Sequence, residues 1–294
     1  SAAQCETAQA KLWRIERDQD GRPEASDEPL VDLIAPTIEQ FKEQMAFLSS
    51  YSDLRSDRAT EILEQLSFLN RFLSPIAYID PARTPYTIEL LNLGLSFATY
   101  TVMRLKYGLG VKRPIEFSPQ VQPMIPTPTH CSLPSGHATQ AFMISRLLWK
   151  LLIASKTTQY QEDGVWGEML MRQADRIAVN RTVAGVHFPV DSVAGCVLGL
   201  TMAEYIAELS DPKTRRVTSA SFDGTRFPGT EDFDWHLLYH AEKDRQTAHA
   251  GPDGRYWATT SHQKVKKWQA SAPLVWLWDQ AVAEWQDLPP RCGA

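Results

Sequence analysis

The spacing of apolar residues is the feature that most constrains the fold of this 294-residue chain. Apolar side chains recur near every 3.6 positions along most of the sequence, which is the period of an amphipathic helix. Sustained alternation of apolar and polar residues, which would predict strands, does not recur. The pattern therefore predicts an all-α helical bundle. Because 43% of the residues are hydrophobic and no Gly/Ser linker divides the chain, we expect one domain over residues 1–294.

Three stretches depart from the helical pattern. Residues 1–30 are polar and contain proline and glycine, which predicts a loosely attached arm. Residues 114–134 hold six prolines and predict a loop that wraps over a pocket. Residues 210–262 are polar and rich in glycine and proline, which predicts an irregular lid or loop. The expected helices cover 38–48, 55–72, 86–107, 136–156, 166–184, 187–209 and 270–285.

A small set of polar residues recurs at the ends of the central predicted helices. In chain order it consists of Lys106, Arg113-Pro114, Pro134-Ser135-Gly136-His137, Arg181, His187 and Asp191. A lysine supplies a point charge, and arginine side chains supply planar forks that match phosphate-like oxygens. The hydroxyl of Ser135 and the backbone N–H groups near Gly136 complete a pocket for a tetrahedral oxyanion.

Two histidines in this set are left to do chemistry. His187 and Asp191 are one helical turn apart, so the carboxylate can accept a hydrogen bond from one imidazole nitrogen and fix the tautomer of the other. The second nitrogen of His187 then presents a lone pair to the pocket. His137 lies where it can exchange protons.

The order and spacing of these residues resemble the three-part motif of the type 2 phosphatidic acid phosphatase and vanadium haloperoxidase superfamily. The resemblance covers about residues 86–206. It implies the helical bundle of that superfamily and oxyanion binding by Lys106, Arg113, Ser135, Gly136 and Arg181. One departure is Asn180, which stands where the family usually has serine, so one secondary hydrogen bond is in doubt.

The resemblance implies two alternative reactions. In a phosphatase, His187 attacks phosphorus and forms a phosphohistidine while His137 protonates the leaving oxygen. In a haloperoxidase, the cofactor is vanadate, His187 is the vanadium ligand, and Lys106 polarises bound peroxide, with hydrogen peroxide, a halide and an organic acceptor as substrates. We expect vanadate and phosphate to share one site in either case.

His130 is the residue that separates the two reactions at the sequence level. At this position the chain resembles the haloperoxidases that oxidise bromide, which have a histidine near the halide site. A histidine at the rim of the pocket is, however, compatible with any substrate. Extra helices before Lys106 also favour a haloperoxidase, whereas the compact spacing of the motifs favours a soluble acid phosphatase. On balance the sequence favours a vanadate-dependent haloperoxidase that oxidises bromide, with the acid phosphatase as the alternative and no cofactor in that case.

The net charge and the lengths of the apolar runs predict small molecules, rather than nucleic acid or lipid bilayer, as the partners of this chain. The formal net charge of −5 argues against nucleic acid. The apolar runs 88–103 and 193–206 are shorter than the roughly 20 residues that span a bilayer, so we expect a soluble chain with no membrane span. Both a monomer and a homo-oligomer are compatible with the sequence. No signal peptide is evident before Ser1, and localisation stays open.

The remaining candidate sites are weaker. The four cysteines are too far apart for a Cys-x-x-Cys site, and either Cys5 pairs with Cys292 or all four are free thiols. His236 and His240 are four positions apart, but no third ligand at suitable spacing accompanies them, so we expect a solvated pair rather than a metal site.

Overall fold

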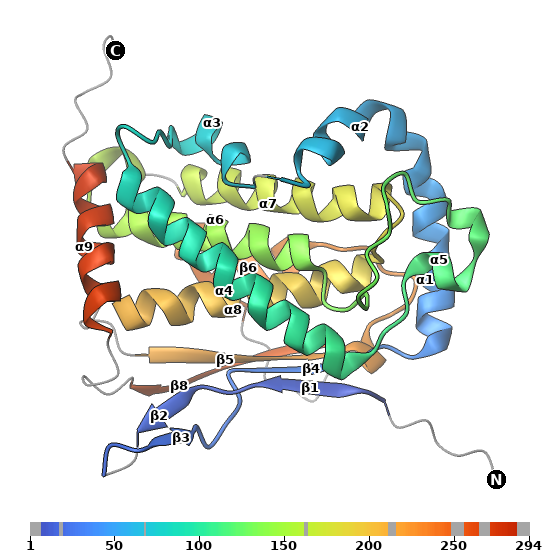
Figure 1. Cartoon of the computed structure of the whole chain (residues 1–294), viewed down its shortest axis with the longest axis horizontal. Helices are drawn as coiled ribbons and strands as arrows, with labels where there is room; N and C mark the ends of the chain where they lie inside the picture. The colour runs from blue at the N-terminus through green and yellow to red at the C-terminus, as the bar shows by residue number, and fades with distance from the viewer. Residues whose placement is uncertain are drawn as a thin grey trace.

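The centre of the molecule is a single buried helix surrounded by others. The computed structural model describes residues 7–17, 20–67, 69–161, 164–210, 216–247, 256–264 and 271–286. In it, α6 (Gly136–Ala154) packs against α4 (Pro85–Leu109), α7 (Val165–Val183) and α8 (Pro189–Ser210). Figure 1 shows α4 crossing in front of the layer that the other three form. The predicted helical bundle is confirmed.

Two glycines let α8 approach α6 closely. A Cβ atom on Gly195 would lie 2.7 Å from the carbonyl oxygen of Ser135, and one on Gly199 would lie 2.4 Å from that of Thr139. Both separations are far inside van der Waals contact, so a larger residue at either position would push the helices apart. The contact at Ser135 matters for function because this residue begins α6 and precedes His137.

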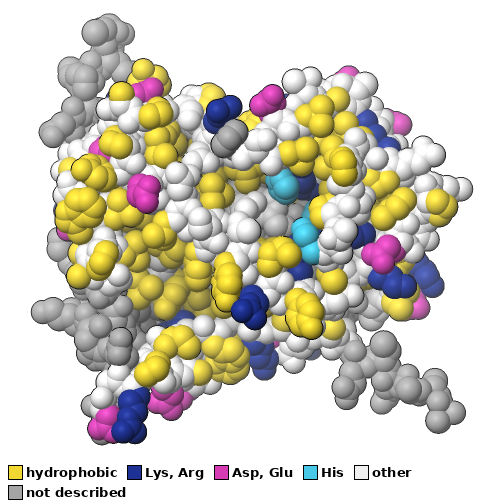
Figure 2. Space-filling view, in the orientation of Figure 1, with side chains coloured by type: hydrophobic (Ala, Val, Ile, Leu, Met, Phe, Trp, Pro, Cys, Tyr) yellow, Lys and Arg dark blue, Asp and Glu magenta, His cyan; other side chains and the backbone are white. Residues whose placement is uncertain are grey.

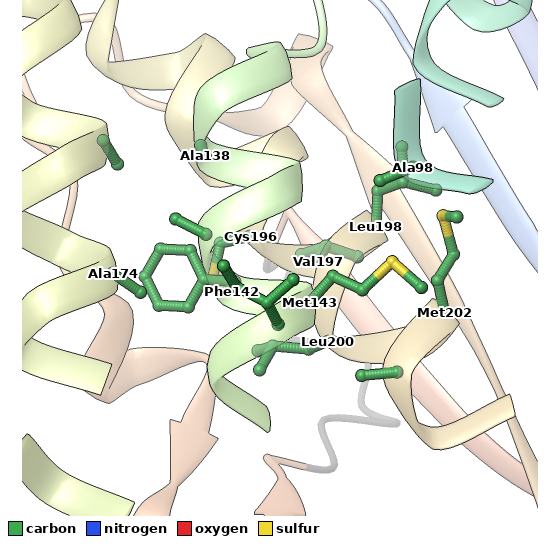
Figure 3. Close-up of a cluster of buried hydrophobic side chains, with 14 of the residues drawn as sticks. Ala98, Ala138, Phe142, Met143, Ala174, Cys196, Val197, Leu198, Leu200 and Met202 are labelled. Atoms are coloured by element: carbon green, nitrogen blue, oxygen red, sulfur yellow. The ribbon is translucent and has the colours of Figure 1, made fainter. Parts of the chain in front are cut away.

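Hydrophobic side chains of α6 and α8 fill the space between the helices. Figure 3 shows Phe142 and Met143 of α6 among Val197, Leu198 and Leu200 of α8. The thiol of Cys196 is fully buried in the same cluster. Cys196 and the partly exposed Cys131 are both free cysteines. Cys5 and Cys292 lie outside the described residues, so their pairing stays a prediction.

Smaller helices surround this centre. The predicted helix 55–72 is broken: α2 ends at Glu64, Gln65 caps it, and the chain then turns into a short 3₁₀ helix. The peripheral α-helices are α1 (Ile38–Tyr51), α2 (Arg55–Glu64), α3 (Ser74–Ala77), α5 (Pro114–Phe117) and α9 (Ala272–Gln286). The 3₁₀ helices are η1 (Ser52–Leu54), η2 (Leu69–Phe72), η3 (Pro119–Val121), η4 (Thr158–Tyr160), η5 (Gly224–Arg226), η6 (Trp235–Leu237) and η7 (Ala241–Lys243).

A four-stranded sheet lies against α8 and was not expected from the sequence (Figure 1). Its order is β1-β4-β5-β8, with β4 and β5 parallel and the outer pairs antiparallel. These strands are β1 (Gln9–Leu12), β4 (Val31–Ile34), β5 (Arg216–Asp223) and β8 (Trp257–Lys264). Two further pairs are β2 (Ile15–Arg17) with β3 (Pro23–Ala25), and β6 (Tyr239–His240) with β7 (Arg245–Gln246).

The sheet corrects two of the sequence predictions. The arm expected over residues 1–30 is joined to the domain by the pairing of β1 with β4. The segment 210–262, expected to be irregular, supplies β5 and most of β8. The strands escaped the sequence pattern because β4 alternates over only four residues, with Val31 and Leu33 buried, and its partner β5 lies at the other end of the chain.

Helix α8 has a length and composition that the sequence analysis underestimated. The apolar run 193–206 was judged too short to span a bilayer, but the helix extends to Pro189 and Ser210 and has 22 residues. Among the described helices it alone is long and apolar enough to cross a membrane. Within its most apolar window, 89% of the residues are buried inside the protein, between α6 and the sheet.

Candidate active site

The polar residues singled out in the sequence converge at one end of the central helices. Lys106 is in the last turn of α4, His137 is in the first turn of α6, and Arg181 is in the last turn of α7. His187 precedes α8 by two residues. A cavity of about 190 Å³ is lined by Lys106, Arg113, His130, Gly136, His137, Arg181 and His187. Figure 2 shows histidine side chains in a hollow on this face, with cationic side chains beside them.

The hydrogen bonds of His187 define its tautomer. Its Nδ1 lies 2.9 Å from Oδ2 of Asp191, and because a carboxylate only accepts, Nδ1 carries the proton. Its Nε2 lies 3.0 Å from Nη1 of Arg113, and because a guanidinium only donates, Nε2 is the acceptor. The Nε2 lone pair therefore faces the cationic side of the cavity.

The carboxylate of Asp191, which orients His187, is itself positioned by hydrogen bonds. It is fully buried, and its Oδ2 also accepts from the backbone N–H of Phe188 and from the hydroxyl of Ser132. Sequence reasoning missed Ser132, which carries no motif beyond its place two residues before Pro134. Three donors on one oxygen fix the carboxylate in the direction that His187 requires.

The cations are buried, and one has nitrogen atoms without partners. Lys106 donates to the carbonyl oxygen atoms of Cys131 and Ser132. In Arg181, which is 1% exposed, Nη2 donates to Oε1 of Gln65 at 2.7 Å, while Nε and Nη1 have no hydrogen-bond partner among the described residues. A buried N–H group without an acceptor is costly, so these atoms call for an anion.

Burial also shifts the pKa values of these cations. It lowers the pKa of Arg181 to about 10, and it lowers the pKa of Lys106 well below its ordinary value, with the charge of Arg113 adding to the effect. An anion in the cavity would reverse both effects, because it would stabilise the charged forms. The cavity is therefore suited to a small group with more than one negative charge.

His137 lies on the other side of the cavity and is neutral when the cavity holds no anion. Burial, followed by the charge of Arg181, lowers its pKa to about 3. Its Nε2 is 3.2 Å from the backbone carbonyl oxygen of Gln65, which only accepts, so Nε2 carries the proton. Nδ1 is left to take up a second proton and deliver it.

Gln65 is a second residue of this site that sequence reasoning missed. Besides holding His137 through its carbonyl, it accepts at Oε1 from Arg181 and from Nδ2 of Asn180, and it donates from Nε2 to Glu61. In the sequence, Gln65 is one of several polar residues of the predicted amphipathic helix 55–72, and no motif distinguishes it. The amide of Asn180, which departs from the family pattern, also accepts from Arg58, so it joins Arg58 to Gln65.

Two predicted residues contact their neighbours rather than presenting free groups to the cavity. Ser135 is buried and its hydroxyl accepts from the N–H of Ala138 as the N-cap of α6, so it does not line the cavity. His130 does line it, but Nδ1 of this ring lies 3.0 Å from Nη2 of Arg113. Both residues therefore support neighbouring groups, Ser135 the helix and His130 the arginine.

No metal site appears in the part of the chain that the structure describes. No group of three or more His, Cys, Asp or Glu side chains there could hold a metal ion. His236 contacts Asp234 and stacks on Trp235, while His240 is in strand β6, so the two histidines do not share a helical face.

Comparison with known proteins decides the family. Residues 86–215 match the model of the PAP2 superfamily. This segment of the chain belongs to the PAP2 superfamily. The match includes Lys106, Arg113, His137, Arg181 and His187, and it leaves Gln65 outside. The resemblance drawn from the sequence motif is confirmed.

Similarity beyond the PAP2 segment is limited. A transmembrane PAP2-type phosphatidylglycerolphosphate phosphatase from Bacillus subtilis is 21% identical, with a TM-score of 0.45, and the alignment covers 57% of this chain and 84% of that one. No curated protein gives a significant match.

Proposed function

We propose that this PAP2 protein hydrolyses phosphate monoesters through a phosphohistidine at His187. The observation that carries the proposal is the orientation of His187, whose unprotonated Nε2 faces a buried cavity with three cations. A nucleophile with a fixed lone pair beside matched positive charge is what phosphoryl transfer requires. Membership of the PAP2 superfamily supports this chemistry.

The two steps follow from the positions of the histidines. Nε2 of His187 forms a bond to phosphorus as the bond to the ester oxygen breaks, and the leaving oxygen takes a proton from His137. Water then gives a proton to His137 and attacks phosphorus, and the bond to His187 breaks to release phosphate. Arg113 and Arg181 stabilise the negative charge that the phosphoryl oxygens carry throughout.

Halide oxidation, which the sequence favoured, loses its main support. The preference rested on His130, and the ring of that residue contacts Arg113, which either reaction needs. The space beside His137 suits an ester, because a groove of about 770 Å³ opens there. Such a volume accommodates an organic leaving group.

Vanadate fits the same cavity, since it is a tetrahedral oxyanion like phosphate. Lys106, Arg113 and Arg181 would hold its oxygens, and His187 would be the ligand of vanadium. Bound in this way it supplies a pentavalent centre that resembles the phosphoryl transition state. In a phosphatase, vanadate is therefore expected to act as a competitive inhibitor.

We also propose that α8 belongs to the core of a soluble protein. Its residues are buried on all sides by α6, the sheet and neighbouring helices, so a position in lipid would require the domain to open. A helix that is apolar all round is expected at the centre of a large domain.

The proposed activity is tested by two assays on the purified protein. We expect phosphate release from an aryl phosphate, inhibited competitively by vanadate, because ester and vanadate need the same cations. With vanadate, peroxide and bromide, we expect bromination of a phenolic dye to stay at background. Bromination without any phosphate release would reject the proposal in favour of the haloperoxidase.

The low pKa of His137 leads to a prediction about pH. The folded protein holds this residue neutral above about pH 3, whereas an unperturbed histidine titrates near 6.5. The free enzyme therefore brings no proton to the leaving oxygen, and the substrate monoanion must supply it. Because a phosphate monoester loses that proton near pH ~6, kcat/KM should be flat below that pH and fall about tenfold per unit above it.

The matching measurement is an NMR titration of the His137 ring. Its pKa should rise from about 3 when phosphate is bound, because the anion offsets the charges of Arg181, Lys106 and Arg113. A kcat/KM that rises between pH 6 and 8, or a His137 pKa that phosphate leaves unchanged, would contradict this assignment of the proton.

A further inference from the structure

A groove next to the active-site cavity is placed to receive the leaving group. It has a volume of about 770 Å³ and lies between α4 and the segment that connects α2 to α4. The groove and the cavity share Leu66, His137 and Gln140. In Figure 1 the connecting segment runs above α4, on the side of the molecule where the hollow of Figure 2 lies.

The distribution of charged residues assigns each end of the substrate. His187 and the three cations line the cavity and are absent from the groove, whereas His137 lines both. In an in-line displacement the attacking nitrogen and the leaving oxygen lie on opposite sides of phosphorus. The leaving oxygen therefore lies at His137, and the rest of the leaving group extends into the groove.

The groove presents amides and hydroxyls beside aliphatic side chains. Asn70 in η2 and Asn92 in α4 contact one another across it, with Nδ2 of Asn70 2.9 Å from Oδ1 of Asn92. This leaves Nδ2 of Asn92 and Oδ1 of Asn70 without a partner among the described contacts. The polar lining residues are Gln65, Ser67, Asn70, Arg71, Ser74, Asn92, His137 and Gln140, and the aliphatic ones are Leu66, Leu69, Ile79, Pro81, Ile88 and Leu95.

The same lining excludes several kinds of leaving group. It contains no carboxylate to pair with an amine and, in the described part of the chain, no aromatic side chain to stack on a nucleobase. A long alkyl chain would remove water from the amides of Asn70, Asn92 and Gln140 without replacing their hydrogen bonds, which is costly. Hydroxyl groups on a carbon skeleton suit both the amides and the aliphatic side chains.

Resting on the proposed phosphatase activity, we propose that the groove binds a polyhydroxy alcohol, so that the substrate is a sugar or polyol phosphate. Asn92 and Gln140 are then specificity-determining residues. Gln140 is suited to this task because its Nε2 is already held by Oγ1 of Thr99 at 2.8 Å, which directs its Oε1 outward as an acceptor.

The test compares two esters whose leaving groups are both primary alcohols. We define a preference ratio as kcat/KM for a hexose 6-phosphate divided by kcat/KM for ethyl phosphate, which cannot fill the groove. We expect the ratio to exceed about ten in the wild-type protein, and Asn92→Leu to lower it about tenfold or more through lost hydrogen bonds to hydroxyl groups. Gln140→Met should lower it in the same direction.

A matched control is Gln173→Leu, an amide-to-leucine change in a different hollow on α7, which should leave the ratio unchanged. Equal use of both esters by the wild type, or a ratio that Asn92→Leu does not change, overturns the groove assignment while phosphatase activity stands. Decyl phosphate hydrolysed in preference to the hexose ester overturns it in favour of an aliphatic leaving group. Failure to hydrolyse any phosphate ester refutes the proposed function itself.

Discussion

Replacing His187 by alanine should lower kcat for phosphate ester hydrolysis by roughly a thousandfold or more, because the variant has no atom that can form the bond to phosphorus. The cations Lys106, Arg113 and Arg181 remain, so phosphate should still bind. The measurement is steady-state hydrolysis of an aryl phosphate together with calorimetric binding of phosphate. Loss of turnover with retained binding is the result that identifies a nucleophile.

Trapping of the intermediate makes this test sharper. Acid-labile label from a ³²P-labelled aryl phosphate should appear on the wild type after rapid denaturation and should be missing from His187→Ala. In His137→Ala the label should accumulate, because an aryl oxide leaves without a proton whereas the attacking water has lost its base. His236→Ala, a change at an exposed histidine far from the cavity, is the control and should behave as wild type. Label on the His187→Ala protein would refute the assignment.

Asp191→Asn should lower kcat by roughly a thousandfold to ten-thousandfold, the size of effect seen when an orienting carboxylate is lost from a catalytic histidine. An asparagine amide that donates to Nδ1 of His187 moves the ring proton to Nε2. That proton would then face Nη1 of Arg113, so two donors would oppose one another at 3.0 Å and no lone pair would face phosphorus. Activity assays and thermal melting of the same samples measure the effect.

The melting temperature separates orientation from folding. The amide has nearly the shape of the carboxylate, but its nitrogen would take the place of the oxygen that accepts from the N–H of Phe188, so we expect the melting temperature to fall by several degrees while the protein still folds. Ser132→Ala is the matched control, because it removes another partner of the same oxygen and leaves the tautomer of His187 intact. Near-normal turnover in Asp191→Asn would show that the carboxylate serves only as a structural cap.

The helices and the cationic cavity were accessible from sequence because both rest on local patterns. Helices α4, α6, α7 and α8 begin and end within three residues of the predicted bounds, since each buries a continuous apolar surface. The site residues sit at the ends of those helices, where a charged side chain interrupts an apolar pattern. Lys106 and His137 stood out for this reason.

Features that depend on distant partners were not accessible in this way. The sheet pairs residues 31–34 with 220–223. Over four residues, an alternation of apolar and polar side chains cannot be distinguished from chance. The break of the predicted helix 55–72 at Gln65 is of the same kind. Its backbone and side chain face His137 and Arg181, which belong to other helices, so nothing local distinguishes it from any polar residue of an amphipathic helix.

The position of Gln65 has a consequence for what counts as the catalytic unit. The PAP2 match begins at residue 86, but Gln65 lies before it, at the end of α2. The backbone carbonyl of Gln65 accepts from His137, and its side-chain Oε1 accepts from Arg181. The segment 86–215 alone would contain every motif residue, but His137 and Arg181 would lack these hydrogen-bond acceptors. In this protein the region before the shared segment therefore contributes to the proposed active site, and a graft or truncation at the family boundary would divide that site.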